Sequence, residues 1–153
     1  MVPLKSLNNV SIHLAEDKDL QTVIDILLPA FLPDNTSNMR LRKTNKLKMT
    51  VTKRVTNGQT YILMKEDTPI GACVVEYIPI PTIVHINIVQ EEKVSRHVGW
   101  FIHYILNNAF KTKTVFVLEP KEDFTSILTH VKRNVYRFKT TFVDNLNKLY
   151  KDS

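Results

Sequence analysis

The sequence predicts an α/β (α+β) fold in which helices cover both faces of a mixed, mostly antiparallel sheet. Short apolar runs with strand character alternate along the chain with longer segments whose apolar residues recur every three or four positions. The 153 residues are 43% hydrophobic and 24% charged, which provides enough apolar material for one hydrophobic core. Because no repeat, low-complexity tract or linker interrupts the chain, we expect a single domain over residues 1–153.

The first third of the chain predicts one strand and two helices. Alternating residues at 10–14 predict the strand, and "AEDKD" predicts a turn whose acidic residues favour a helix N-terminus. The helix that follows should end or kink near Leu28, because Pro29 interrupts its stripe of Leu20, Val23, Ile24, Leu27, Leu28 and Phe31. A second helix is expected at 39–55, with Gly58 as its C-terminal cap.

The rest of the chain predicts a hairpin, a strand–helix–strand unit and two further elements. The run "TYILMKEDTPIGACVVEYIPI" indicates two strands joined by the "KEDTP" turn. A strand at 82–90, a helix at 96–110 and a buried strand at 114–119 predict a crossover between two parallel strands. Residues 121–138 have apolar residues at helical spacing and predict another helix, and the tail at 139–153 predicts a strand or an edge segment.

The composition argues against several classes of protein. Cys73 is the only cysteine, so no internal disulfide framework or cysteine-rich metal site is expected, and its apolar surroundings predict a buried, inert thiol. The five histidines are dispersed without zinc-ligand spacing, and no Walker loop or Ser-His-Asp signature occurs. No apolar stretch approaches the roughly 18–20 residues that span a bilayer, and the N-terminus lacks a signal-peptide pattern. We therefore expect a cytoplasmic protein.

The net charge of +6 is concentrated in one segment. No acidic residue occurs from Thr36 to Lys65, whereas seven cations lie at 40–54: Arg40, Arg42, Lys43, Lys46, Lys48, Lys53 and Arg54. This basic 40–54 face is either a solvated helix surface or a contact for an anionic partner such as nucleic acid, an acidic protein or a phosphate-bearing cofactor. The absence of aromatic residues from Thr36 to Thr60 disfavours a nucleic-acid module.

The element order resembles that of the GNAT family of N-acetyltransferases. The stretch "IHLAEDKDLQTVIDILLPAF" is similar to the opening strand and helix of the family, and "TYILMKEDTPIGACVVEYI", with Gly71 after its turn, is similar to the central hairpin. At the join of strand and helix, "RHVGWF" resembles the cofactor motif Gln/Arg-x-x-Gly-x-Gly/Ala. Arg96 and Gly99 match this motif, whereas Phe101 stands where the family has a small residue.

The resemblance implies acetyl-CoA (coenzyme A) as the cofactor. Its pyrophosphate would meet the N-terminal turn of the helix, where backbone amides are directed at an anion, at Arg96, His97, Val98, Gly99 and Trp100. Ile88 and Val89 would face the pantetheine arm, where the family's two parallel strands splay apart. From the residues alone, Arg96 could also be a solvated arginine, Gly99 could serve close packing, and Trp100 could be a core aromatic.

Phe101 distinguishes an intact phosphate site from a blocked one. Three or four residues separate Phe101 from Val98 and Ile105, so its ring can lean toward the apolar side of the helix. We predict this arrangement, which leaves the amides of residues 97–100 free to bind a pyrophosphate. A ring placed over those amides would instead prevent cofactor binding.

The candidate catalytic residues are Glu76, His85 and Tyr136. Glu76 and His85 are ionisable groups in otherwise apolar strands, as general bases often are, although a solvent-facing glutamate and a hydrogen-bonded sheet histidine remain alternatives. By resemblance Tyr136 would be the general acid in the last helix, but "YRFKTTF" lacks the glycine of the family pattern. Glu119, at the end of its strand, is a further candidate.

Two functions follow as hypotheses. The first is an acyl-CoA-dependent N-acyltransferase that moves an acetyl group from acetyl-CoA to an amine acceptor, either a small molecule or a protein. The second is a catalytically lapsed GNAT-fold binding or structural protein, such as a viral or phage component, which forms a homo-oligomer or a viral assembly. Phe101, the loose tyrosine pattern and the basic 40–54 face favour the second hypothesis.

Overall fold

The computed structural model describes residues 3–31, 37–89, 96–110, 115–118 and 122–151. Two compact units divide the chain. The first unit comprises Met1–Val74 and Ile86–Val89, and the second comprises Val75–His85 and Gln90–Ser153. No helix among the described residues has both the length and the apolar character needed to cross a membrane.

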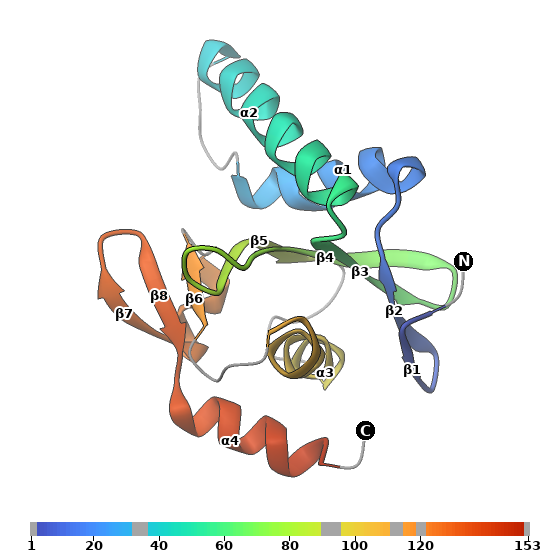
Figure 1. The fold of residues 1–153 in the computed structure, drawn as a ribbon, viewed down its shortest axis with the longest axis vertical. Helices are drawn as coiled ribbons and strands as arrows, with labels where there is room; N and C mark the ends of the chain where they lie inside the picture. Colours follow the sequence, from blue (N-terminus) through green and yellow to red (C-terminus); the bar gives the residue numbers. More distant parts are fainter. Residues whose placement is uncertain (1–2, 32–36, 90–95, 111–114, 119–121, 152–153) are drawn as a thin grey trace. The chain divides into compact units, whose positions relative to one another are not determined.

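The described strands form an eight-stranded sheet in the order β1-β2-β3-β4-β5-β6-β8-β7 (Figure 1). Pairing is parallel between β5 and β6 and antiparallel for β1–β2, β2–β3, β3–β4, β6–β8 and β7–β8. The predicted mixed, mostly antiparallel sheet is therefore confirmed. The strands are β1 Lys5–Leu7, β2 Val10–Leu14, β3 Thr60–Lys65, β4 Thr68–Glu76, β5 Thr82–Ile88, β6 Phe116–Leu118, β7 Leu128–Lys132 and β8 Val135–Phe138.

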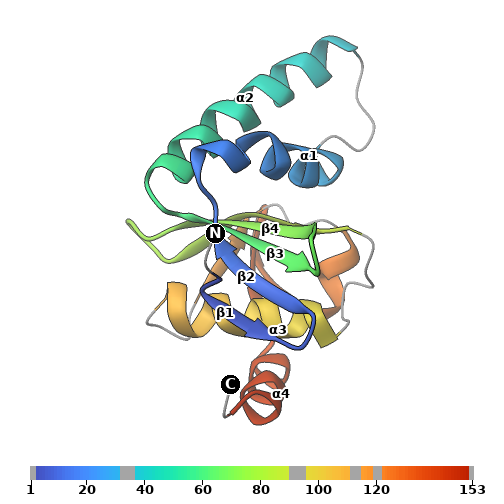
Figure 2. The ribbon, with the colours of Figure 1, turned by 90° about the vertical axis from the view of Figure 1, so that its right-hand side faces the viewer.

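In the first unit, helices α1 (Leu20–Phe31) and α2 (Ser37–Thr56) lie side by side next to strands β2–β4 (Figures 1 and 2). A short 3-10 helix, Asp17–Asp19, precedes α1, and the Glu16 amide donates a hydrogen bond to the Asp19 carboxylate at 3.0 Å. The acidic "AEDKD" segment therefore caps the start of this helical region. The core combines sheet and helix residues: Ile12, Leu63, Val23, Leu27, Leu47 and Val51.

Three details of the first unit bear on the sequence predictions. Helix α1 continues to Phe31 with Pro29 inside it, so it does not end at Leu28. Gly58 adopts φ 71° just after α2, which confirms its predicted role as a cap in the left-handed region. The β1–β2 hairpin was missed, because the short "LKSL" segment lacks a strand pattern of useful length.

In the second unit, β5 and β6 form the predicted parallel pair, with Thr82 opposite Phe116 and Ile83 opposite Val117. The connection between them contains helix α3 (Arg96–Tyr104), which continues as one turn of π-helix at Ile105–Ala109. The predicted strand–helix–strand order is thus present.

The end of the chain differs from the sequence prediction. Residues 121–138 were expected to form a helix, but a 3-10 helix at Glu122–Ile127 is followed by the β7–β8 hairpin. The hairpin turns at Arg133 and Asn134, where Asn134 adopts φ 60°, a conformation that asparagine tolerates well. The tail, expected as a strand, forms helix α4 (Thr140–Leu149), so both predictions were wrong.

Candidate active site

Strand register in the second unit brings His85, Tyr136 and a third aromatic side chain to one sheet face. Ile83 pairs with Val117, and Val117 pairs with Tyr136, so these residues share a face. His85 lies two residues beyond Ile83 and therefore projects to the same side. His130 is the register partner of Tyr136, and their ring centroids are 5.0 Å apart.

Glu76 projects to the same side as His85. A Cβ placed on Gly71 would lie 3.0 Å from the Ile88 side chain, so Gly71 and Ile88 share one face. Side chains alternate along each strand, which puts Glu76 of β4 and His85 of β5 together on the opposite face. Both are half-buried. The three candidate catalytic residues therefore project from one side of the sheet.

Tyr136 lies in β8 and not in a last helix, which corrects the context that the resemblance implied for it. Its half-buried ring contacts exposed His130, a residue that the sequence reasoning did not select. Simple alternation around the two-residue turn would place Val131 across from Tyr136, and a shift in register between His130 and Lys132 brings His130 there instead. The further candidate Glu119 lies outside the described residues.

Helix α3 begins at an exposed arginine, Arg96, and becomes buried within one turn. The next residue, His97, is half-buried. The following residues are all buried: Val98, Gly99, Trp100, Phe101 and Ile102. Val98 and Trp100 can therefore offer a ligand only their backbone groups, and Trp100 is a core aromatic. Phe101 has an exposed fraction of 0%, which confirms the prediction that its side chain is buried in the apolar side of the helix.

The two residues of α3 that match the cofactor motif are both contacted by α4, which lies beside α3 in the second unit (Figures 1 and 2). A Cβ on Gly99 would meet Leu146 Cδ2 at 3.0 Å. The hydroxyl of Tyr150 donates a hydrogen bond to the main-chain carbonyl of Arg96 at 2.7 Å. The absence of a side chain at Gly99 therefore permits close packing of the two helices.

Ile88 and Val89, the residues predicted to face the pantetheine arm, belong to the first unit. The amide of Val89 donates to the carbonyl of Ile70 in β4 at 2.7 Å. Because neighbouring residues in a strand direct their backbone groups to opposite sides, the backbone of Ile88 is directed away from β4.

Asn87 is a buried polar residue that the sequence reasoning passed over. Its side chain is 1% exposed, and its Nδ2 donates to the Ile26 carbonyl of α1 at 2.8 Å. Its Oδ1 has no hydrogen-bond partner among the described residues. An asparagine within the apolar run "IVHINIV" was the signal, since a buried amide needs partners for both its atoms.

Cys73 is fully buried in β4, as predicted, and burial raises the pKa of its thiol. A thiol that stays protonated is a poor nucleophile and a poor metal ligand. Within the part of the chain that the structure describes, no three His, Cys, Asp or Glu side chains gather as a metal site would require.

No protein-family model and no curated protein matches this sequence. Solved structures do match it, and they share one class of fold. The PaiA N-acetyltransferase of Thermoplasma acidophilum in complex with coenzyme A matches with a TM-score of 0.62 at 9% identity, over 84% of this chain and 96% of that chain. A GNAT-family acetyltransferase of Listeria monocytogenes matches with a TM-score of 0.55 at 11% identity, over 83% and 91% of the two chains.

A third match, a GNAT-family acetyltransferase of Bacillus cereus, has a TM-score of 0.54 at 12% identity and covers 84% of this chain and 93% of that chain. At such low identity the likeness concerns the fold. The chain is therefore a divergent example of the GNAT fold, as its sequence predicted.

Proposed function

We propose that this protein is an acyl-CoA-dependent N-acyltransferase that transfers an acetyl group from acetyl-CoA to an amine. The observation that carries the proposal is the β5–α3–β6 unit. Its parallel pairing covers Thr82 and Ile83, the first two residues of β5, and the connecting helix α3 begins with an exposed arginine. In a chain with the GNAT fold, such a unit is suited to an anionic, elongated cofactor.

The residues at the start of α3 fit a coenzyme A phosphate group. Helix N-termini have backbone amides without intrahelical partners, and these attract anions. The Arg96 guanidinium is exposed, and Phe101, which departs from the family motif, is buried away from solvent. Arg96 would hold a phosphate at the first turn of α3, which contains His97, Val98, Gly99 and Trp100.

The sheet face that contains Glu76, His85 and Tyr136 provides groups for proton transfer. When bound, the cofactor supplies an activated thioester. Glu76 or His85 would accept a proton from the acceptor amine, directly or through a water molecule. The Tyr136 hydroxyl, with His130 beside it, would donate a proton to the leaving sulfur. The acceptor is a small-molecule or protein amine, and the free, buried Cys73 suits a reducing, cytoplasmic location.

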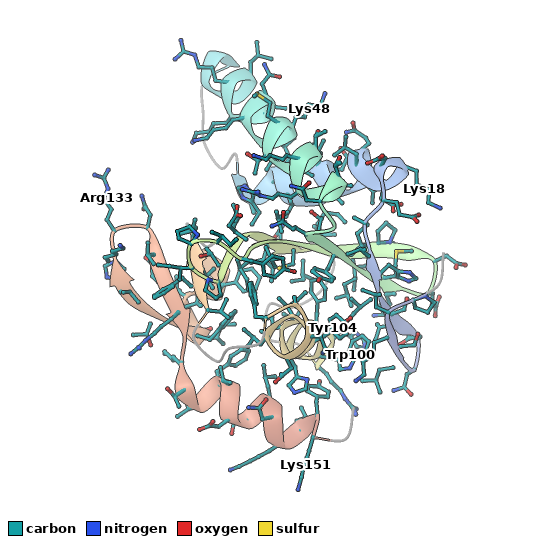
Figure 3. The ribbon with its side chains drawn as sticks, in the orientation of Figure 1. Lys18, Lys48, Trp100, Tyr104, Arg133 and Lys151 are labelled. Atoms are coloured by element: carbon teal, nitrogen blue, oxygen red, sulfur yellow. The ribbon has the colours of Figure 1, made fainter. Side chains whose placement is uncertain are left out.

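Calorimetric titration with acetyl-CoA tests this proposal. We expect binding to the wild-type protein, and about a tenfold or greater loss in Arg96→Glu, because the change reverses a charge that would contact phosphate. Arg133→Glu is the matched control, since Arg133 lies at the tip of the β7–β8 hairpin and undergoes the same charge reversal (Figure 3). No heat of binding at millimolar acetyl-CoA would remove the enzymatic function.

A second candidate function is a GNAT-fold protein that binds an anionic partner, and the outer surface of α2 favours it. Leu47, Val51 and Val55 are buried on one side of this helix. Arg42, Lys46 and Lys53 lie on the opposite side at helical spacing, exposed like Lys48, which projects from α2 in Figure 3. Among the described residues, the ion pair observed is Lys18–Glu16, and none involves these α2 cations.

Titration with heparin, a model polyanion, separates the two functions. The binding function predicts tight, salt-dependent association that Lys46→Glu combined with Lys53→Glu abolishes, whereas Arg133→Glu leaves it unchanged. A solvated helix face predicts weak association that all variants share. Heparin binding without any response to acetyl-CoA would favour the non-enzymatic function.

A further inference from the structure

Tyr150 joins the end of α4 to the start of α3. It is only 3% exposed, and its hydroxyl donates to the Arg96 carbonyl at 2.7 Å. Its ring also contacts the His103 ring, with centroids 5.5 Å apart. The Tyr150 amide donates to the Leu146 carbonyl at 2.9 Å, which completes the last turn of α4 and fixes the position of the tyrosine.

The hydroxyl of Tyr150 fixes the main chain at Arg96. Burial raises the pKa of Tyr150, and the positive charge of Arg96 opposes this effect. The phenol therefore stays protonated at neutral pH and can donate to the Arg96 carbonyl. The bond thereby restrains the main chain from which the exposed Arg96 side chain projects.

Leu146 adds a steric element to the same contact. Its Cδ2 lies 3.0 Å from where a Cβ of Gly99 would be, and its side chain is 6% exposed. Side-chain packing at Gly99 and a hydrogen bond at Arg96 thus act three residues apart on the first turn of α3.

The geometry points to Tyr150 as a positioning residue that holds Arg96 for the phosphates of coenzyme A. This inference rests on the proposed acyltransferase function and adds the C-cap residue of α4 to its cofactor site. Because Tyr150 acts through Arg96, its effect is confined to ligands that have phosphates. Binding of S-acetylpantetheine, a thioester without phosphates, should therefore not change when the Tyr150 hydroxyl is removed.

Tyr150→Phe removes the hydroxyl and keeps the ring. We expect the dissociation constant for acetyl-CoA, measured by calorimetry, to rise roughly fivefold, the effect of one hydrogen bond to a charged or polar partner. The KM for S-acetylpantetheine and kcat with either donor should stay unchanged. Tyr104→Phe is the matched control, since it removes a hydroxyl from the last residue of α3, the helix that begins with Arg96.

A double-mutant cycle that combines Tyr150→Phe with Arg96→Ala tests whether Tyr150 acts through Arg96. If Tyr150 acts through Arg96, Tyr150→Phe adds less than about twofold to the dissociation constant once the guanidinium is gone. Unchanged acetyl-CoA binding in Tyr150→Phe, an equal loss for S-acetylpantetheine, or additive effects in the cycle would each overturn the inference while the proposed function stands. A wild-type protein that binds neither donor would instead overturn the proposed function, and this inference with it.

Discussion

Leu146 lies against Gly99 so closely that a Cβ added to the glycine would come within 3.0 Å of Leu146 Cδ2. The glycine that matches a cofactor motif is thus also the point where α4 packs against α3. Two explanations for the same residue, phosphate approach and helix packing, make different predictions about stability.

Gly99→Leu should reduce the free energy of unfolding by about 1–3 kcal/mol, because the added side chain overpacks the α3–α4 contact. Urea denaturation would measure the change, and Leu146→Ala in the same background should recover part of it. Gly99→Ala should be close to neutral, since the helical preference of alanine offsets the small shift of a flexible leucine end. A Gly99→Leu protein as stable as the wild type would show that packing does not explain this glycine.

Phe101→Ala restores the small residue of the family motif, yet it should not improve cofactor binding. The ring is fully buried, so its removal should cost about 3–5 kcal/mol of stability through lost burial and a cavity. Phe142→Ala, which truncates a half-buried ring of α4, is the control and should cost less. Tighter acetyl-CoA binding by Phe101→Ala would mean that the native ring obstructs the phosphate site.

Glu76→Gln and His85→Gln separate the two candidate general bases. Each removes an ionisable group and keeps a polar side chain of similar size, and the variant of the true base should lose about two to four orders of magnitude in kcat. The measurement is release of free thiol from acetyl-CoA in the presence of an amine acceptor. Glu66→Gln, at the exposed β3–β4 turn, is the control. If both variants have the activity of the wild type, neither residue is the base.

His13 predicts a pH dependence of stability that is separate from catalysis. Desolvation lowers the pKa of its ring, and its Nε2 shares a 2.8 Å hydrogen bond with Ser11 Oγ. The unfolded chain therefore takes up a proton at a higher pH than the folded chain does. Stability from this group is complete above about pH 6.5 and falls as the pH drops below it, since the unfolded state then binds more protons.

His13→Gln should flatten that dependence. Urea midpoints measured between about pH 5 and pH 7.5 should fall more steeply on acidification for the wild type than for the variant. His97→Gln is the control for removal of a histidine elsewhere in the chain. Parallel curves for the wild type and His13→Gln would contradict the prediction.

The sequence predicted those elements whose pattern was local and unambiguous. The β3–β4 hairpin, the β5–α3–β6 unit and the buried side of Phe101 all follow from short-range periodicity. Residues 121–138 were misread because Ile127, Leu128, Val131 and Val135 are spaced like a helix, although alternation and the Asn134 turn form a hairpin. Tertiary pairing with β6 decided between these two local patterns.

The candidate site was predicted only in part, for a related reason. Glu76, His85 and Tyr136 were chosen one at a time, and only strand register places them on a common face. His130 and Tyr150 could not be chosen, because each acts through a neighbour that depends on the misassigned end of the chain. When a strand is predicted as a helix, or a helix as a strand, the side chains that come into contact are predicted wrongly, even if each residue has been considered.

Strand β7 is the last strand of the sheet in the described part of the chain, and four of its five residues are exposed. A terminal strand with free backbone groups is a template on which another chain can add a strand and begin to aggregate. Lys132 at its end opposes such addition, because an added strand would have to desolvate its charge. The irregular pairing between His130 and Lys132 also opposes it, because such an irregularity increases the local twist of the strand and disrupts a regular hydrogen-bond ladder. The hairpin that brings His130 to Tyr136 thereby also helps to keep the protein from polymerising through its sheet.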